Sequence, residues 1–541
     1  MAVESLTPYS FLAAYLLIFP VSLALYRLCF HPLSKVPGPR LAAITPLWYA
    51  YHIRRSRLLL LGQELHDKYG PAVRIAPNEV QFNSKEAFQA IYGGMGYLQK
   101  SDFYYAFSNN PGYIDWLFRR HPTDDGFTIN GELDIQRHRG QRKNIGTTYS
   151  AASVRKYGGP IDAVLRRFVA KLKTQERRTV ELAEWVHIAI VECISVVTLG
   201  WSPGFIDDGS DHGFWDVSVA KWRQISVFGF LPSLTLLVQK WPGLKPALAA
   251  LCGVTIRKPD GYVPFEQTTM QMIKERASRF FKSEKKPAPP DTDAEAETDI
   301  LTELLHLTTK KPEWKPRHAV GMAFINFIAG RETTTAITTA ALALICTNPD
   351  SKARVVAEAL EHDGVGKCGA YTQACIKETL RLRPVTSFSL SRIVPSANAN
   401  ANADGAGEGL RLHGYAIPPG TAVGVQVPAL HLNTEIFGPD AAVFRPERWL
   451  EGEAEGPGLQ RKTLEKTNLA WGAGAHVCPG RNLAELMMGK LIPLLMREFD
   501  IEVAAFPRVE DMATFNYLAF TSGVKVRFHV RRLKVRAGSD G

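Results

Sequence analysis

A single cysteine, Cys478, lies in a glycine-rich stretch, 471–481, that leads directly into the helical pattern of 483–494. Pro479 suits the first turn of a helix, where a missing N–H leaves no hydrogen bond unmade. Glycines on both sides of the cysteine permit positive φ and a close approach of the backbone to a planar group. These glycines are Gly472, Gly474 and Gly480. Because free N–H groups at a helix start stabilise negative charge on sulfur, the stretch predicts a thiolate; the alternative is a buried cysteine in a turn.

Small and hydroxyl-bearing residues occupy the middle of a long helical pattern, 317–347, which would span about 45 Å. Ala329 and Gly330 remove side-chain bulk from one face, and Thr333 can turn its hydroxyl toward the carbonyl four residues earlier. Glu332 adds a carboxyl group that can carry a proton. The pattern predicts a groove for a small molecule beside a proton carrier. The alternative is a buried helix whose threonines bond to their own backbone and whose glutamate pairs with a neighbour.

Another charged pair occurs on a helical pattern further along the chain. Glu378 and Arg381 lie three residues apart on one helix face, and Pro384 stops that helix. Arg448 follows in the irregular stretch 444–449. A pair with this spacing is usually a modest surface contact.

A basic helical pattern over 134–146 carries His138 and Arg142 four residues apart, hence on one face. The pair could hold carboxylates, with a solvated helix face as the alternative. The net charge of +11 favours contact with something acidic, such as a membrane surface, an acidic protein or nucleic acid. The other basic residues are scattered and form no recognisable nucleic-acid module, so nucleic acid is not expected as a partner.

The seven cysteines show neither a Cys-x-x-Cys pair nor close clustering. A disulfide scaffold and a zinc site are therefore not expected. Asn-x-Ser/Thr acceptor sites are also absent from the sequence, which agrees with a cytosolic location for the folded part.

The first forty residues are predicted to tether the chain to a membrane. Residues 9–26 form an almost unbroken apolar run, about long enough for a helix to cross a thin bilayer. Glu4 precedes the run and basic residues follow it, so the positive-inside rule places the rest of the chain in the cytosol. A cleaved signal peptide is the alternative, but it would carry positive charge before the run. The prolines of 31–40 predict a stiff hinge between an anchor, 1–30, and the body, 41–541.

Helical patterns dominate the body, with a few short strands. Residues 72–77 and 79–82 are predicted as strands on either side of a turn. Residues 389–394 and 412–417 are expected to form an elongated hairpin, with the low-complexity insertion 397–407 at its tip.

Three further segments have an unusual composition. The aromatic and Pro/Gly/Asn-rich segment 101–128 reads as a long loop of the kind that is often functional. The very apolar segment 227–251 predicts either core or a surface that dips into lipid. Residues 282–298 read as a disordered surface connection.

Four motifs occur in an order that is typical of one family. They are Ala-Gly-x-Glu-Thr at 329–333, Glu-x-x-Arg at 378–381, Phe-x-Pro-Glu-Arg at 444–448 and Gly-x-His-x-Cys-x-Gly at 474–480. Together they resemble the haem-thiolate monooxygenases, the cytochromes P450, over essentially the whole chain. The hinge and loop style resembles fungal microsomal members that tailor secondary metabolites. The resemblance implies a mainly α fold with a small β region, in one large catalytic domain behind an N-terminal transmembrane anchor.

The resemblance also implies roles for individual residues. Cys478 would be the proximal thiolate ligand of haem b (iron protoporphyrin IX), a ligand that favours O–O cleavage. Glu332 and Thr333 would relay protons to the distal oxygen, and Ala329 and Gly330 would leave room for O2. The positions that match haem-propionate ligands are His138, Arg142, Arg392 and His476. The other cofactor-binding positions of the cysteine loop are Trp471, Gly474 and Gly480.

The same resemblance gives Glu378, Arg381 and Arg448 a structural role as a buried charge network. Three positions depart from the family pattern. Trp471 stands where phenylalanine is usual, His476 where arginine is commoner, and His138 where tryptophan is frequent.

The implied activity is insertion of one oxygen atom from O2 into a lipophilic small molecule, in secondary-metabolite biosynthesis. NADPH would supply electrons through a flavin-containing NADPH–cytochrome reductase. Membrane lipid would be a second partner, at the endoplasmic reticulum, with a single membrane pass and the catalytic domain in the cytosol. The alternatives are a haem-thiolate isomerase, dehydratase or phenol-coupling enzyme, and a haem-binding sensor or electron carrier.

Overall fold

The computed structural model describes the chain over ten ranges. They are 18–93, 98–107, 113–114, 120–121, 129–283, 299–361, 368–395, 409–450, 464–508 and 518–532. Helices dominate these ranges, and the strands form four small sheets. The expected mainly α fold with a small β region is thereby confirmed.

The α-helices vary from single turns to one of 32 residues. They are α2 Arg40–Ile44, α3 Leu47–Arg54, α4 Leu58–Tyr69, α5 Lys85–Phe88, α6 Ile135–Ile145, α7 Ala151–Val154, α8 Gly158–Lys173, α9 Leu182–Leu199, α10 Phe205–Asp208, α11 Phe214–Phe230, α12 Pro232–Lys240, α13 Lys245–Leu251, α14 Phe265–Ser283, α15 Ile300–Lys310, α16 Pro316–Thr347, α17 Pro349–Glu361, α18 Ala370–Leu382, α19 Val427–His431, α20 Thr434–Phe437 and α22 Arg481–Glu498.

Short 3-10 and π turns connect several of them. They are η1 Tyr26–Phe30, η2 Gln89–Gly93, η3 Asp102–Phe107, η4 Arg155–Tyr157, η5 Pro242–Leu244, η6 Pro446–Trp449, η7 Leu469–Trp471 and η8 Gly474–His476. The strands are β1 Ala72–Ala76, β2 Glu79–Phe82, β3 Tyr113–Ile114, β4 Arg120–His121, β5 Thr179–Glu181, β6 Arg392–Ile393, β7 Leu410–Leu412, β8 Tyr415–Ile417, β9 Ala422–Val425, β10 Phe499–Ala505 and β11 Lys525–Val530.

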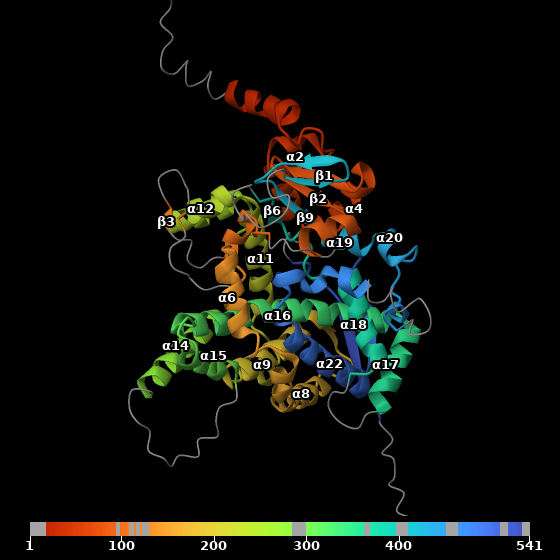
Figure 1. Ribbon diagram of the computed structural model, residues 1–541. Helices are drawn as coiled ribbons and strands as arrows, with labels where there is room; N and C mark the ends of the chain where they lie inside the picture. Colours follow the sequence, from red (N-terminus) through yellow and green to blue (C-terminus); the bar gives the residue numbers. More distant parts are fainter. Residues whose placement is uncertain are drawn as a thin grey trace, which may run out of the picture.

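The long helix α16 crosses the middle of the molecule, with the larger sheet above it and α8, α9 and α22 below it in Figure 1. It begins at Pro316, where the missing N–H leaves no helical hydrogen bond unmade. Its main packing partner is α9, which is buried along almost its whole length. A Cβ atom added at Gly330 would lie 2.4 Å from Cδ1 of Ile194, so the missing side chain is what allows the two helices to approach this closely.

The larger sheet has the strand order β1-β2-β9-β6. The predicted strands 72–77 and 79–82 are confirmed as β1 and β2, and β9 pairs in parallel with β2. The predicted pairing of 389–394 with 412–417 is wrong. β6 instead pairs with β9, while β7 and β8 form their own hairpin around His413 and Gly414, which both have positive φ as a tight turn requires.

The N-terminal helix Ile18–Phe30 projects from the top of the molecule in Figure 1 and is apolar and largely exposed. Residues 1–17, with the first half of the predicted apolar run, lie outside the described residues. Among those described, α9 is the helix long and apolar enough to cross a membrane, but it is 89% buried and belongs to the core.

The proline-rich segment 31–40 packs against the sheet instead of standing free as a spacer. Leu33 is completely buried, and the backbone N–H of Arg74 donates to the carbonyl of Pro37 at 2.7 Å. The guanidinium of Arg74 also donates to the carbonyl of Arg27 at 2.8 Å. The end of the N-terminal helix is therefore held in one direction relative to β1.

A fully buried ion cluster joins α18 to the irregular segment before the cysteine loop. Both oxygens of Glu378 accept from Arg381, at 2.8 and 2.9 Å. Nε of Arg448 donates to the same carboxylate at 2.9 Å, as does the indole N–H of Trp449. The buried charge network that the family resemblance implies is therefore confirmed, and the alternative of a modest surface contact is wrong, because none of these groups reaches solvent appreciably.

We predict that Glu378→Gln lowers the free energy of unfolding by about 3–5 kcal/mol, because it leaves the buried guanidinium of Arg381 without its counter-charge and Arg448 with only Asp440, at 3.4 Å. Urea unfolding of the full chain in detergent, followed by tryptophan fluorescence, measures the change. Glu64→Gln is the matched control, since Glu64 pairs with Arg57 on the surface and its loss should cost less than about 0.5 kcal/mol. Equal costs for the two variants would contradict the prediction.

Candidate functional site

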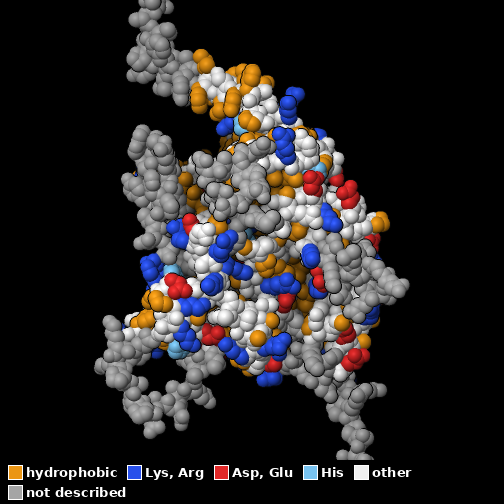
Figure 2. Space-filling model, in the orientation of Figure 1, with side chains coloured by type: hydrophobic (Ala, Val, Ile, Leu, Met, Phe, Trp, Pro, Cys, Tyr) orange, Lys and Arg blue, Asp and Glu red, His pale blue; other side chains and the backbone are white. Residues whose placement is uncertain are grey.

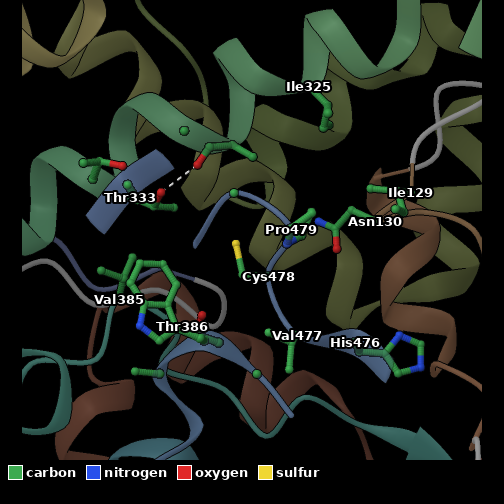
Figure 3. A pocket seen from close by; sticks show the side chains of 18 of the residues that line it. Ile129, Asn130, Ile325, Thr333, Val385, Thr386, His476, Val477, Cys478 and Pro479 are labelled. Carbon is green, nitrogen blue, oxygen red and sulfur yellow. Dashed lines mark hydrogen bonds between the residues drawn. The ribbon is translucent and has the colours of Figure 1, made fainter. Parts of the chain in front are cut away.

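A cavity lies between the middle of α16 and the cysteine loop. Figure 3 shows the sulfur of Cys478 pointing into it, while Thr333 of α16 lines it from the opposite side. Thr333 and Cys478 belong to separate sequence patterns and lie 145 residues apart in the chain. The tertiary structure brings them to one space.

Two features of the loop hold Cys478 in place. Gly472 has φ of +74°, and the N–H of Cys478 then closes the turn by donating to the carbonyl of Trp471 at 2.8 Å. Trp471, Gly472 and Gly480 line the cavity, and a Cβ atom at Gly480 would lie 3.9 Å from the sulfur. α22 begins directly after the loop, so its N-terminus faces the thiol as the sequence predicts.

The electrostatics of Cys478 differ from the expected lowering. Burial raises the pKa of the thiol above its ordinary value and outweighs the backbone N–H groups of Gly480 and Arg481 and the charge of Arg142, which lower the pKa. The protein without a metal therefore favours the thiol. A bound metal ion would supply the positive charge that a thiolate needs.

The wall opposite Cys478 is built from one face of α16. Ala329, Gly330 and Thr333 line the cavity, and Thr333 Oγ1 donates to the carbonyl of Ala329 at 2.6 Å, drawn as a dashed line in Figure 3. The predicted bond from this threonine to its own helix is confirmed. This part of the groove is therefore lined by the hydroxyl oxygen of Thr333 and by two small residues, Ala329 and Gly330, and by no bulky side chain of these three positions.

Glu332 points away from this wall. It is fully buried, is absent from the residues that line the cavity, and forms an ion pair with Arg331. Arg331 in turn contacts Glu266 of α14 at 2.6 Å and lies over the ring of Phe214. One residue of helix rotation, about 100°, separates the glutamate from the threonine, which is why the two neighbours face different partners.

The rim of the cavity carries five basic side chains. They are Lys100, His138, Arg142, Arg392 and His476. The rings of His138 and His476 lie 4.5 Å apart. No aspartate or glutamate is found among the described residues that line this cavity.

These basic groups influence one another. Burial and the charges of Lys100, Arg142 and Arg392 lower the pKa of His138 to about 3. Burial, with the charge of Arg392 as the next cause, lowers the pKa of Lys100 well below its ordinary value. Because these cations lower one another's pKa and no aspartate or glutamate is among the described lining residues, a bound anion would stabilise the charged forms of the cluster.

Lys100 is a rim residue that no sequence pattern indicated. Its ammonium donates to the carbonyls of Ile129 and Asn130, at 2.9 and 3.0 Å, which fixes it at the rim. An isolated lysine between two short irregular segments has no spacing pattern that distinguishes it from a surface lysine. Only the fold shows that it is buried beside Arg392.

Besides Glu332, one further predicted position lies away from the cavity. Gly474 is not among the lining residues, but it has φ of +58°, and a Cβ atom there would come within 2.8 Å of the carbonyl of Tyr92. Gly474 thus shapes the loop by close approach to another segment.

The buried ion cluster reaches the cysteine loop through His431. Arg381 donates to the carbonyl of His431 at 2.7 Å, and Nδ1 of His431 donates to the carbonyl of Arg381. Nε2 of His431 accepts from the N–H of Leu469 at 2.9 Å, at the start of the turn that holds Trp471. This histidine, which no motif indicated, connects the charge network to the segment that positions Cys478.

Comparison with known proteins agrees with this arrangement. The family model for cytochrome P450 matches residues 39–523. The chain is 37% identical to cytochrome P450 monooxygenase sdnT of Sordaria araneosa, with 98% of this chain and 97% of that protein covered. It is 30% identical to a pisatin demethylase of Fusarium vanettenii, over 91% of each chain, and 29% identical to cytochrome P450 monooxygenase gsfF of Penicillium aethiopicum, over 95% and 96%.

The chain belongs to the cytochrome P450 family, and it is accordingly an oxidoreductase with a haem cofactor. Members of the family use O2 and a reductase partner and act on small molecules.

The residues present fit a haem group. The cysteine sulfur faces a groove in which α16 presents small side chains, as a flat macrocycle between them requires. The rim cations have no acidic partner among the lining residues, and the two propionates of haem would supply one. Among the described residues no group of three or more His, Cys, Asp or Glu side chains could hold a metal ion by itself, so Cys478 suits the role of a single axial ligand.

A pH effect follows from His431, whose pKa is lowered to about 3 by burial and by Arg381. Between pH 6.5 and 3 His431 is protonated in the unfolded chain and neutral in the folded chain. The free energy of unfolding should therefore fall as the pH falls through this window. The slope contributed is at most about 1.4 kcal/mol per pH unit. His431→Gln, which retains an acceptor for Leu469, should show a shallower slope between pH 6 and 4.

Urea unfolding at several pH values measures both slopes. The same substitution at the exposed His306 controls for the loss of an imidazole. Identical slopes for wild type and His431→Gln would show that His431 is not buried as a neutral group.

Proposed function

We propose that this protein is a haem-thiolate monooxygenase that inserts one oxygen atom from O2 into a lipophilic small molecule, in fungal secondary metabolism. NADPH supplies the electrons through a flavin-containing reductase. The observation that supports this best is the cavity in which the sulfur of Cys478 faces the Thr333 groove of α16, with a cluster of basic side chains at the rim. The similarity to cytochrome P450 monooxygenases sdnT and gsfF supports the same reaction class.

In this proposal the cofactor is haem b, and it supplies the activation of oxygen. Cys478 is the iron ligand. Arg142, Arg392, His138 and His476 hold the propionates, and Lys100 joins them as a fifth group. A histidine with a lowered pKa, such as His138, can still bind a propionate, because its neutral imidazole N–H can donate to a carboxylate.

The residues of α16 would leave room for O2 and supply protons to it. Ala329 and Gly330 leave room for O2, and Thr333 Oγ1 holds a proton at the groove, ready to donate when its bond to the Ala329 carbonyl opens. Glu332 resupplies Thr333, which requires its side chain to leave Arg331. One carboxylate oxygen of Glu332 has no hydrogen-bond partner among the described residues, so a water molecule can occupy that side.

We propose the domain boundaries 1–30 for the anchor, 31–40 for the stiff connector and 41–541 for the catalytic domain. The protein would cross the membrane of the endoplasmic reticulum once, with the catalytic domain in the cytosol. Figure 2 shows hydrophobic side chains gathered on the projecting N-terminal helix. A second group of exposed apolar side chains, available for contact with lipid, comes from the helices around the sheet: Leu41, Leu47, Tyr51, Trp241, Leu244 and Leu251.

The basic side chains of helix α6 lie on two different sides, one toward the cavity and one toward solvent. His138 and Arg142 face the cavity, whereas Arg137, Arg139 and Lys143 are exposed. In Figure 2 Lys and Arg side chains gather over this part of the surface. We propose these exposed residues as the docking surface for the acidic face of the reductase.

The central test is the spectrum of the reduced, CO-bound protein. Wild type should show the red-shifted Soret band of a thiolate-ligated haem, and Cys478→Ala should lose it, because the axial sulfur is gone. Cys368→Ala is the matched control, since this cysteine packs against Gly489 of α22 and should leave the band unchanged. A band that survives in Cys478→Ala would place the ligand elsewhere.

Thr333→Ala should lower product formation and divert NADPH consumption to hydrogen peroxide, because the groove loses its proton-holding hydroxyl. Thr338→Ala is the control: it removes the same kind of bond, from Thr338 Oγ1 to the Thr334 carbonyl at 2.7 Å, at a position that does not line the cavity. The ratio of peroxide to NADPH consumed measures the effect. An unchanged ratio in Thr333→Ala would remove the proposed proton role.

A further inference from the structure

One polar side chain in the cavity wall is not used by any role described so far. Asn326 lies on α16, on the face that also presents Met322, Ala329, Gly330 and Thr333 to the cavity. Its spacing from them, three, four and seven residues, keeps it on the same stripe of the helix. The side chain is 8% exposed.

The amide of Asn326 is held in one orientation. Its Oδ1 accepts from the hydroxyl of Tyr149 at 2.8 Å. Burial raises the pKa of Tyr149 above its ordinary value, so this phenol keeps its proton and donates it. The carbonyl of Tyr149 accepts from Asn482 at 2.9 Å, which ties the tyrosine to α22.

This orientation leaves the other end of the amide unsatisfied. Nδ2 of Asn326 is buried and has no hydrogen-bond partner among the described residues. Buried amide donors are nearly always paired, because an unmade hydrogen bond forfeits the hydration that the group had in water. A free donor on a cavity wall therefore indicates a partner that enters the cavity.

The neighbouring wall is largely apolar. Ile194, Met322, Ile325 and Ile337 line the cavity along α9 and α16. In such a pocket a few polar groups usually fix the orientation of the ligand. Asn326 lies seven residues before Thr333, about 10 Å along the helix axis.

We propose that Asn326 is a specificity-determining residue whose Nδ2 donates to a carbonyl oxygen of the substrate. The substrate class is then a lipophilic molecule with a carbonyl group about 10 Å from the carbon that is oxidised beside Thr333. This inference rests on the proposed monooxygenase function. Tyr149 acts as the positioning residue, because it determines which end of the amide is free.

The test uses matched pairs of a steroid-sized ketone and its parent hydrocarbon, namely 5α-androstan-3-one and 5α-androstan-17-one, each compared with 5α-androstane. Each is titrated into the holoenzyme, and the shift of the ferric Soret band gives its Kd. Only preparations that show the thiolate band with CO are used, so that failure of the proposed function is seen separately. Wild type should bind at least one ketone more tightly than its hydrocarbon, by about 3- to 10-fold.

Two variants examine the donor itself. Asn326→Asp keeps the acceptor for Tyr149 and removes the free donor, and Asn326→Leu removes both; each should reduce the ketone preference to about onefold with little change for the hydrocarbon. Tyr149→Phe retains the amide but frees its rotation, and should give an intermediate preference. These ratios compare two ligands on one protein, so a partial loss of folded enzyme does not alter them.

Three outcomes would overturn the inference. The first is a wild-type enzyme without ketone preference for any pair. The second is a preference that Asn326→Asp and Asn326→Leu retain, which would mean that the amide holds only an internal water. The third is a changed Soret band of the ligand-free variants with unchanged ratios, which would place the amide against the haem edge.

Discussion

The carboxylate of Glu378 is shared between two buried guanidinium groups, and the position of the cysteine loop depends on it. Arg381 receives its counter-charge from this carboxylate and then has donors left for the carbonyls of His431 and Ala441. His431 accepts from the N–H of Leu469, two residues before Trp471, and the carbonyl of Trp471 accepts from the N–H of Cys478. A buried ion cluster of this kind contributes little net stability, yet it is costly to break, and this makes it suited to holding a loop in one place.

The rim of the cavity has the opposite electrostatic character. Lys100, Arg142 and Arg392 are gathered with two histidines and without an acid among the described lining residues. Besides burial, the charges of Arg142 and Arg392 lower the pKa of both Lys100 and His138, so the positively charged forms of these groups are destabilised by one another. A bound anion would reduce this repulsion. In the proposed function the haem propionates would be such an anion, and cofactor binding would then stabilise this part of the fold.

Much of the fold could be predicted from local patterns. The long helix expected over 317–347 is α16, Pro316–Thr347, and the basic helix expected over 134–146 is α6, Ile135–Ile145. Helical periodicity and the stop signals of proline are properties of neighbouring residues, and they do not need the rest of the chain. The hairpin expected between 389–394 and 412–417 failed because the tight turn at His413 and Gly414 pairs Leu410–Leu412 with Tyr415–Ile417, while the next strand, β9, pairs with β6.

The sequence by itself determined which residue types were available for chemistry: one cysteine before a helix, a threonine beside a glycine in a long helix, and basic residues on one face of another. It could not say which way Glu332 would point, because one residue of helix rotation, about 100°, decides between a cavity and an arginine. Nor could it single out Lys100, His431 or Asn326, whose importance comes from burial beside distant segments. Tertiary structure decided these points, since burial and unmet hydrogen bonds are properties of the surroundings that packing creates and not of the residues themselves.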